Sequence, residues 1–116
     1  MPSSDEARRL RDIIENIDHA VSYVGTRGHD AFAAERMRVD AVERCIERMA
    51  EAMIKIGAAR MAAIAPEIPL PGIRQLGNIL RHEYDQVDPR LVHAIVTERM
   101  PRLRAACERA LAADGG

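Results

Sequence analysis

The sequence has few aromatic side chains, a single lysine and no long apolar run. Its 116 residues include two tyrosines, one phenylalanine and no tryptophan, too few rings for the stacking platform that grips single-stranded bases. No apolar stretch approaches the roughly 20 residues that span a bilayer. The chain also has no charged and then apolar leader at its start. These absences predict a cytoplasmic protein without a membrane segment.

The sequence has no excess of charge of either sign, since its net charge is −1. No global attraction to nucleic acid is expected, so any RNA contact must be local. The basic residues are nearly all arginine, with Lys55 the exception. This bias fits either genomic base composition or the use of arginine as a phosphate ligand.

The length fits a single domain, residues 1–116, which can bury roughly two-thirds of its unfolded surface without a metal or disulfide. The two cysteines, Cys45 and Cys107, fall on different predicted helices, and we interpret both as buried thiols. Strand-like alternation is missing, and helical periodicity runs through the chain. The sequence therefore predicts an all-α, up-and-down helical bundle.

The first half of the chain predicts two long helices. Residues 4–26 carry an apolar stripe and acidic residues in the first turn, and Asp30 can cap a second helix that reaches residue 63, with a kink near residues 37–40. Phe32 is expected in the core, and Glu51 beside the buried stripe is expected to pair with an arginine. His19 and His29 are expected in solvent. The stripe of the second helix consists of Val42, Cys45, Ile46, Met49, Met53 and Ile56.

Prolines organise the second half. Three of them between Pro66 and Pro71 predict a connector that leads into a helix over residues 71–84. Asp88 and Pro89 predict the cap and first position of the next helix, with His93 on its surface. Pro101 predicts a break or kink. The residues expected to face inward are Leu91, Ile95 and Val96, and then Leu103, Ala106, Cys107 and Ala110 or Leu111.

The stretch from Ile73 to Tyr84, IRQLGNILRHEY, combines an apolar stripe with a polar one. Arg74, Asn78 and His82 recur at every fourth residue and so share a helix face. Gly77 lies inside this helix, where glycine costs about 1 kcal/mol relative to alanine. Arg74 precedes it by three residues and Arg81 follows it by four, so two guanidiniums flank a position without a side chain.

His82 suggests acid–base chemistry on a phosphodiester. A histidine can exchange a proton near neutral pH, and a neighbouring arginine can stabilise the charge of a five-coordinate phosphorus. Together they suffice for metal-independent RNA cleavage by the 2′-hydroxyl, with Asn78 placed to orient the ring. No metal-ligand spacing accompanies His82, and we expect no cofactor. By itself this pattern also fits an ordinary packed or solvated histidine.

The chain resembles the HepT-like members of the HEPN superfamily, the helical toxins of two-gene toxin–antitoxin systems. The resemblance rests on GNILRHEYDQVD, on the flanking PEIPLPGIR, DPRLV and MPRLRAACERAL segments, and on DAFAAERMRVDAVERCIERMAEAMIKI. It implies a four- to five-helix bundle that forms a symmetric dimer, with the two motif helices facing a shared cleft.

The family's motif is an arginine, usually followed by asparagine, then a histidine and, two residues later, a tyrosine. Asn78, His82 and Tyr84 match this motif, whereas Gly77 occupies the arginine position. The resemblance implies that arginine and histidine carry ribonuclease activity. It also implies that a partner nucleotidyltransferase antitoxin attaches AMP to the tyrosine in some members and silences the toxin.

Gly77 leaves three interpretations open. In the first, the guanidinium of Arg81 or Arg74 enters the space beside Gly77, and RNA cleavage survives. In the second, the site is degenerate, and the protein is a non-enzymatic dimer that binds a nucleotidyltransferase. In the third, it is a structural helical dimer without a ligand.

Overall fold

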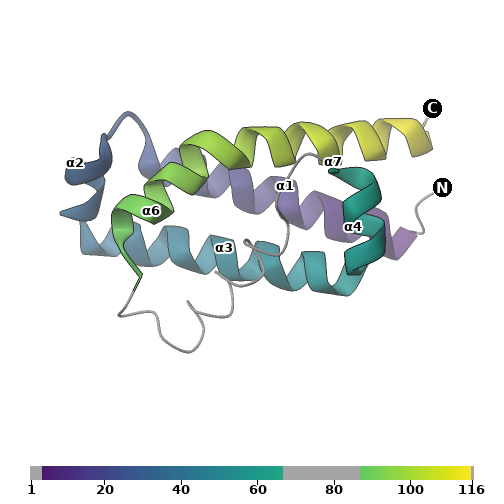
Figure 1. Ribbon diagram of the computed structural model, residues 1–116, viewed down its shortest axis with the longest axis horizontal. Coiled ribbons are helices and arrows are strands. Elements are labelled where there is room, and N and C mark those ends of the chain that lie inside the picture. Colours follow the sequence, from purple (N-terminus) through teal and green to yellow (C-terminus); the bar gives the residue numbers. More distant parts are fainter. Residues whose placement is uncertain (1–3, 67–86, 116) are drawn as a thin grey trace.

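A computed structural model describes residues 4–66 and 87–115, and its helices lie in the order shown in Figure 1. The helices are α1 (Ser4–Val24), α2 (His29–Ala33), α3 (Arg36–Ile56), α4 (Ala58–Ile64), α6 (Pro89–Ala94), the π-helix η2 (Ile95–Arg99) and α7 (Met100–Gly115). No strand occurs in these two ranges, which confirms the predicted all-α class. None of these helices is both long and apolar enough to cross a bilayer.

Three rods form the body of the bundle: α1, α3 and the continuous run α6–η2–α7 (Figure 1). Helices α1 and α3 run antiparallel and share the most extensive contact, and α1 also packs on α7. The short helices α2 and α4 lie at opposite ends of α3 (Figure 1). Each rod contributes one apolar stripe to a common core.

The apolar stripe predicted for residues 4–26 is confirmed in α1, except that Val21, at the same helical spacing, is 45% exposed. Asp5 and Glu6 occupy the first turn, where carboxylates favour the helix dipole. Gly25, at φ +58°, follows the last residue, and glycine adopts this left-handed conformation without steric cost. The buried face consists of Leu10, Ile13, Ile17, Ala20 and Val24.

The prediction of one helix from Asp30 to residue 63 was wrong, because two breaks divide it into α2, α3 and α4. The first break lies at Glu35 (φ −105°, ψ 86°), before the kink expected at residues 37–40. Glu35 is held in place by Arg27 from the turn after α1 and by Arg38 from α3. The second break lies at Gly57, whose φ of +102° is a glycine conformation.

Two polar assignments in this region also need correction. Gly28, not Asp30, is the N-cap of α2, and Asp30 instead accepts a hydrogen bond from Arg90 Nε at 2.8 Å. Glu51 pairs with Lys55 at 3.4 Å and with no arginine of residues 4–66 or 87–115. Since Lys55 follows Glu51 by four residues on one helix, this is a local surface pair.

The core is continuous across the three rods. It confirms the predicted stripe of α3, with Ile56 at its edge, and the predicted core position of Phe32, which is fully buried. Cys45 and Cys107 are buried free thiols, as expected. Burial raises the pKa of Cys45 and raises that of Cys107 to about 12, so both remain protonated and unreactive at neutral pH.

The last rod begins as predicted, and Ile95 and Val96 are buried as predicted, but Leu91 is not. Asp88 caps α6 by accepting a hydrogen bond from the backbone N–H of Arg90 at 2.9 Å. Leu91 was predicted to face inward, but it is 51% exposed, and Val92 is buried instead. Pro101, where a break or kink was predicted, does not interrupt the helical run; it follows η2, where the Met100 N–H bonds to the carbonyl of Ile95. The wider turn precedes a proline that has no N–H to donate.

Candidate functional site

The predicted site residues lie outside the described residues. Residues 67–86 contain His82, Arg81, Arg74, Asn78 and Tyr84. Gly77, the helix predicted over residues 71–84 and most of the proline connector fall in the same range. Whether these side chains meet at one point therefore stays a prediction.

The structure does describe the two helices that flank this segment in the chain, α4 before it and α6 after it. Helix α4 precedes it at one end of α3, and α6 follows it at the other end (Figure 1). Arg60 of α4 donates to Glu6 of α1 at 2.9 Å, and Arg90 of α6 donates to Asp30 of α2 at 2.8 Å. Each flank of the motif-bearing segment is thus tied to the bundle by an arginine–carboxylate pair.

His93 lies on α6, the helix that follows the motif-bearing segment. The sequence analysis did not recognise it as a buried residue. It was predicted on the surface, yet it is only 6% exposed. Its ring lies 4.2 Å from that of His29 and 5.8 Å from that of Phe32, measured between centroids. His29 itself is exposed, as is His19, which agrees with their predicted place in solvent.

The hydrogen bonds of His93 indicate a structural role. Its Nε2 lies 2.7 Å from the carbonyl oxygen of Arg27. A carbonyl only accepts, so Nε2 must carry the proton and donate. His93 therefore joins α6 to the turn that precedes α2. The burial of His93 could have been inferred from the spacing of Val92 and Val96, which define the buried face beside it.

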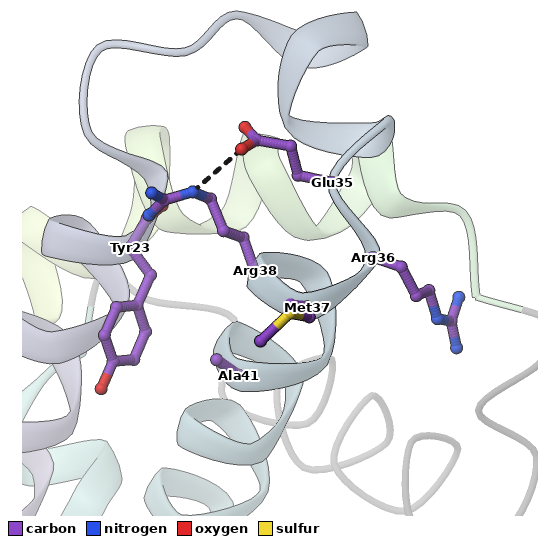
Figure 2. A pocket seen from close by; sticks show the side chains of 6 residues that line it. All are labelled: Tyr23, Glu35, Arg36, Met37, Arg38 and Ala41. Carbon is purple, nitrogen blue, oxygen red and sulfur yellow. Dashed lines mark hydrogen bonds and ion pairs between the residues drawn. The ribbon is translucent and has the colours of Figure 1, made fainter.

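A pocket of about 590 Å³ opens where α1 ends and α3 begins (Figure 2). Its lining residues are Tyr23, Glu35, Arg36, Met37, Arg38 and Ala41. The side chains of Tyr23, Met37 and Ala41 form its apolar part, and Arg36 points away from it (Figure 2).

The side chains of Glu35 and Arg38 in this pocket are already hydrogen-bonded. Glu35 accepts hydrogen bonds from Arg27 and from Arg38 Nε, and Arg38 also donates to the carbonyl of Tyr23 at 3.2 Å. The hydrogen bond from Arg27, reinforced by Arg38, lowers the pKa of Glu35. A carboxylate held ionised in this way is poorly suited to act as a general acid.

Residues 4–66 and 87–115 contain no cluster of three or more histidine, cysteine, aspartate or glutamate side chains that could hold a metal ion. Several charged side chains of these ranges form ion pairs between helices. Arg104 of α7, for example, donates to Asp18 of α1 at 2.7 Å, and this hydrogen bond lowers the pKa of Asp18.

The described structure thus defines an all-α bundle whose two halves are joined by an arginine- and histidine-bearing segment. Residues 13–110 match the model of the family described as ribonuclease HepT-like. The chain belongs to this family.

A protein of Methanocaldococcus jannaschii that carries the name "Putative RNase MJ0127" is 26% identical over 101 residues. The match covers 87% of this chain and 83% of that protein. No solved structure matches the chain.

Proposed function

We propose that this protein is a toxin-type, metal-independent endoribonuclease in which His82 is the general acid or base. The observation that carries the proposal is the match to the HepT-like ribonuclease family, because it extends over residues 13–110 and so includes the whole stretch from Ile73 to Tyr84. The relative named as an RNase supports the same substrate class.

The proposed reaction needs only groups that the chain can supply. The 2′-hydroxyl of RNA attacks the adjacent phosphorus, loses its proton to a base, and displaces the 5′-oxygen of the next nucleotide, which gains a proton. The products are a 2′,3′-cyclic phosphate and a free 5′-hydroxyl. His82 serves one of these proton transfers, and in a symmetric dimer the His82 of a second copy can serve the other. Asn78 orients the imidazole or donates to a phosphate oxygen.

The charge that develops on phosphorus needs a cation, and Gly77 cannot supply it. We assign this role to Arg81, with Arg74 as the second flanking guanidinium, because each lies within one helical turn of Gly77 in sequence. An uncompensated glycine would lose a factor of about 10² to 10³ in rate.

Replacement of Arg81 by alanine is expected to slow RNA cleavage by at least about tenfold. Single-turnover cleavage of a labelled oligoribonucleotide by purified protein in EDTA would measure this loss. The control is Arg8→Ala, since Arg8 is exposed and pairs with Asp5 on α1. Full activity in both Arg81→Ala and Arg74→Ala would contradict the relocated cation.

Tyr84 is proposed as the site of silencing by a nucleotidyltransferase antitoxin of the MNT type. Incubation with the cognate transferase and ATP is expected to add one or more AMP groups, seen by intact mass, with loss of RNA cleavage. Tyr84→Phe should abolish the modification, and Tyr23→Phe serves as the control. Addition of AMP that is unchanged in Tyr84→Phe would remove this role from Tyr84.

Gly77 also supports a second candidate, a degenerate HEPN dimer that acts only as a partner of the nucleotidyltransferase. Such a protein would co-purify with the transferase but would not impair growth when produced alone. Growth arrest that depends on His82 would refute it.

A further inference from the structure

A polar groove of about 240 Å³ lies between α1 and α3, and none of its described lining residues belongs to the pocket of Figure 2. Helix α1 contributes Arg9, Asp12 and Asn16 at helical spacing, and α3 contributes Arg48, Glu51, Ala52 and Lys55. Asn16 is held in place by donating to the Asp12 carbonyl at 2.8 Å.

Two arginines of this groove, Arg9 and Arg48, form no ion pair with a carboxylate among the described residues. The Nε of Arg9 is buried without a hydrogen-bond partner within that part of the chain. Arg48 likewise forms no ion pair with a described residue, whereas its neighbour Arg44 pairs with Glu47 at 3.4 Å and Arg8 pairs with Asp5 at 2.6 Å. A buried donor without an acceptor is unfavourable, so an anionic ligand that accepts a hydrogen bond from Arg9 would relieve this cost.

The order of charges along the groove suits an extended ligand. Because α1 and α3 are antiparallel (Figure 1), Arg9 lies toward the end that holds Lys55, and Asn16 lies toward Arg48. Seven residues separate Lys55 from Arg48, which is about 10 Å along a helix. Positive charge thus marks both ends of the groove, and the carboxylates of Asp12 and Glu51 lie between them.

This alternation matches a sugar–phosphate chain better than a single anion. The guanidiniums can bind phosphate oxygens through paired hydrogen bonds. The carboxylate of Asp12, which has no ion-pair partner among the described residues, can accept a hydrogen bond from a ribose hydroxyl. Glu51 is already paired with Lys55.

We propose that the α1–α3 groove binds the backbone of single-stranded RNA through Arg9 and Arg48, outside the site of cleavage. The proposal rests on the proposed ribonuclease function, because that function supplies RNA as the substrate. It adds a substrate-binding surface that the motif segment does not contain. Arg9 and Arg48 bind and position the RNA and take no part in proton transfer.

The test is the affinity of the full chain for a fluorescein-labelled, 2′-O-methylated oligoribonucleotide, which cannot be cleaved by 2′-hydroxyl attack. Arg9→Gln and Arg48→Gln are each expected to weaken binding roughly tenfold. Each should also reduce the slope of log K against log salt concentration by about 0.7. Fluorescence anisotropy between 50 and 200 mM KCl, as general working conditions, measures both effects.

The matched controls are Arg8→Gln and Arg44→Gln, which remove the same charge from the same two helices but outside the groove. Both should stay within about twofold of the parent protein, since surface ion pairs contribute little. Equal weakening by the controls, or unchanged binding by both groove variants, would overturn the proposal. Arg48 is exposed, so Arg48→Gln tests the groove even where the partly buried Arg9 affects folding, which a thermal melt would reveal.

Cleavage assays separate this proposal from the ribonuclease proposal. With a cleavable oligoribonucleotide, the groove variants should raise KM roughly tenfold and leave kcat unchanged. If the parent protein cleaves RNA and the variants show no change of KM, the groove does not bind RNA, but the ribonuclease proposal stands. If RNA binding depends on the groove but no cleavage occurs, the groove proposal stands and the ribonuclease proposal is refuted.

Discussion

Replacement of His82 by alanine is expected to abolish both growth arrest and RNA cleavage. General acid–base catalysis contributes a factor of about 10² to 10⁴ in rate. Arg74 and Asn78, which share the polar face of the predicted helix with His82, do not exchange a proton near neutral pH. The measurement is growth after induction of the protein alone, beside His82→Ala, in a host without a cognate partner. Cleavage by the two purified proteins in EDTA is compared in parallel.

The control for this experiment is His19→Ala. His19 is an exposed histidine that lies 3.6 Å from Glu15 on α1, so its removal should leave growth arrest and cleavage unchanged. Cleavage retained in both His82→Ala and Arg81→Ala would contradict the ribonuclease assignment and indicate a contaminant. Unimpaired growth with the parent protein would favour the degenerate dimer.

Replacement of Phe32 by alanine is expected to destabilise the fold by about 3 to 5 kcal/mol, as for other buried phenylalanines. Phe32 is fully buried and belongs to α2, a helix of only five residues. Its ring joins α2 to His93 of α6, so the substitution would leave a cavity at this end of the bundle. Thermal unfolding followed by circular dichroism should show the melting temperature fall by about 10 to 20 °C.

The matched control is Met37→Ala on the nearby first turn of α3. Met37 is 87% exposed, so its removal should change the free energy of unfolding by less than about 0.5 kcal/mol. A melting temperature that falls equally in both variants would show that burial is not the cause. An unchanged melting temperature in Phe32→Ala would contradict the core position of its ring.

Helical periodicity was sufficient to predict α1, the core stripe of α3 and the lining of α7, because long amphipathic helices repeat their signal over several turns. It failed where the structure depends on single residues. Gly57 divides α3 from α4 through its positive φ, and a lone glycine carries little weight in a long helical pattern. The break at Glu35 depends on Arg27, which comes from another element.

The short helix α6 shows a second limit of periodicity. With only six residues, its stripe could be drawn through Leu91 or through Val92, and the choice decides whether His93 is buried. The packing of α6 against α2 settles it. For the candidate site, the family predicted from the sequence is confirmed, whereas the roles of the motif residues stay a prediction. The α1–α3 groove could not be foreseen, because Arg9 and Arg48 are far apart in the chain.

The π-helix η2 marks where this bundle can accommodate a change in chain length. A π-turn holds one residue more than an α-turn, and the helical faces on either side of it, marked by Val92 and Leu103, both remain on the core. A chain one residue shorter within η2 would therefore keep both faces in place. The same deletion within α1 or α3 would rotate everything beyond it by about 100°. Insertions and deletions among relatives are thus expected to gather at this turn.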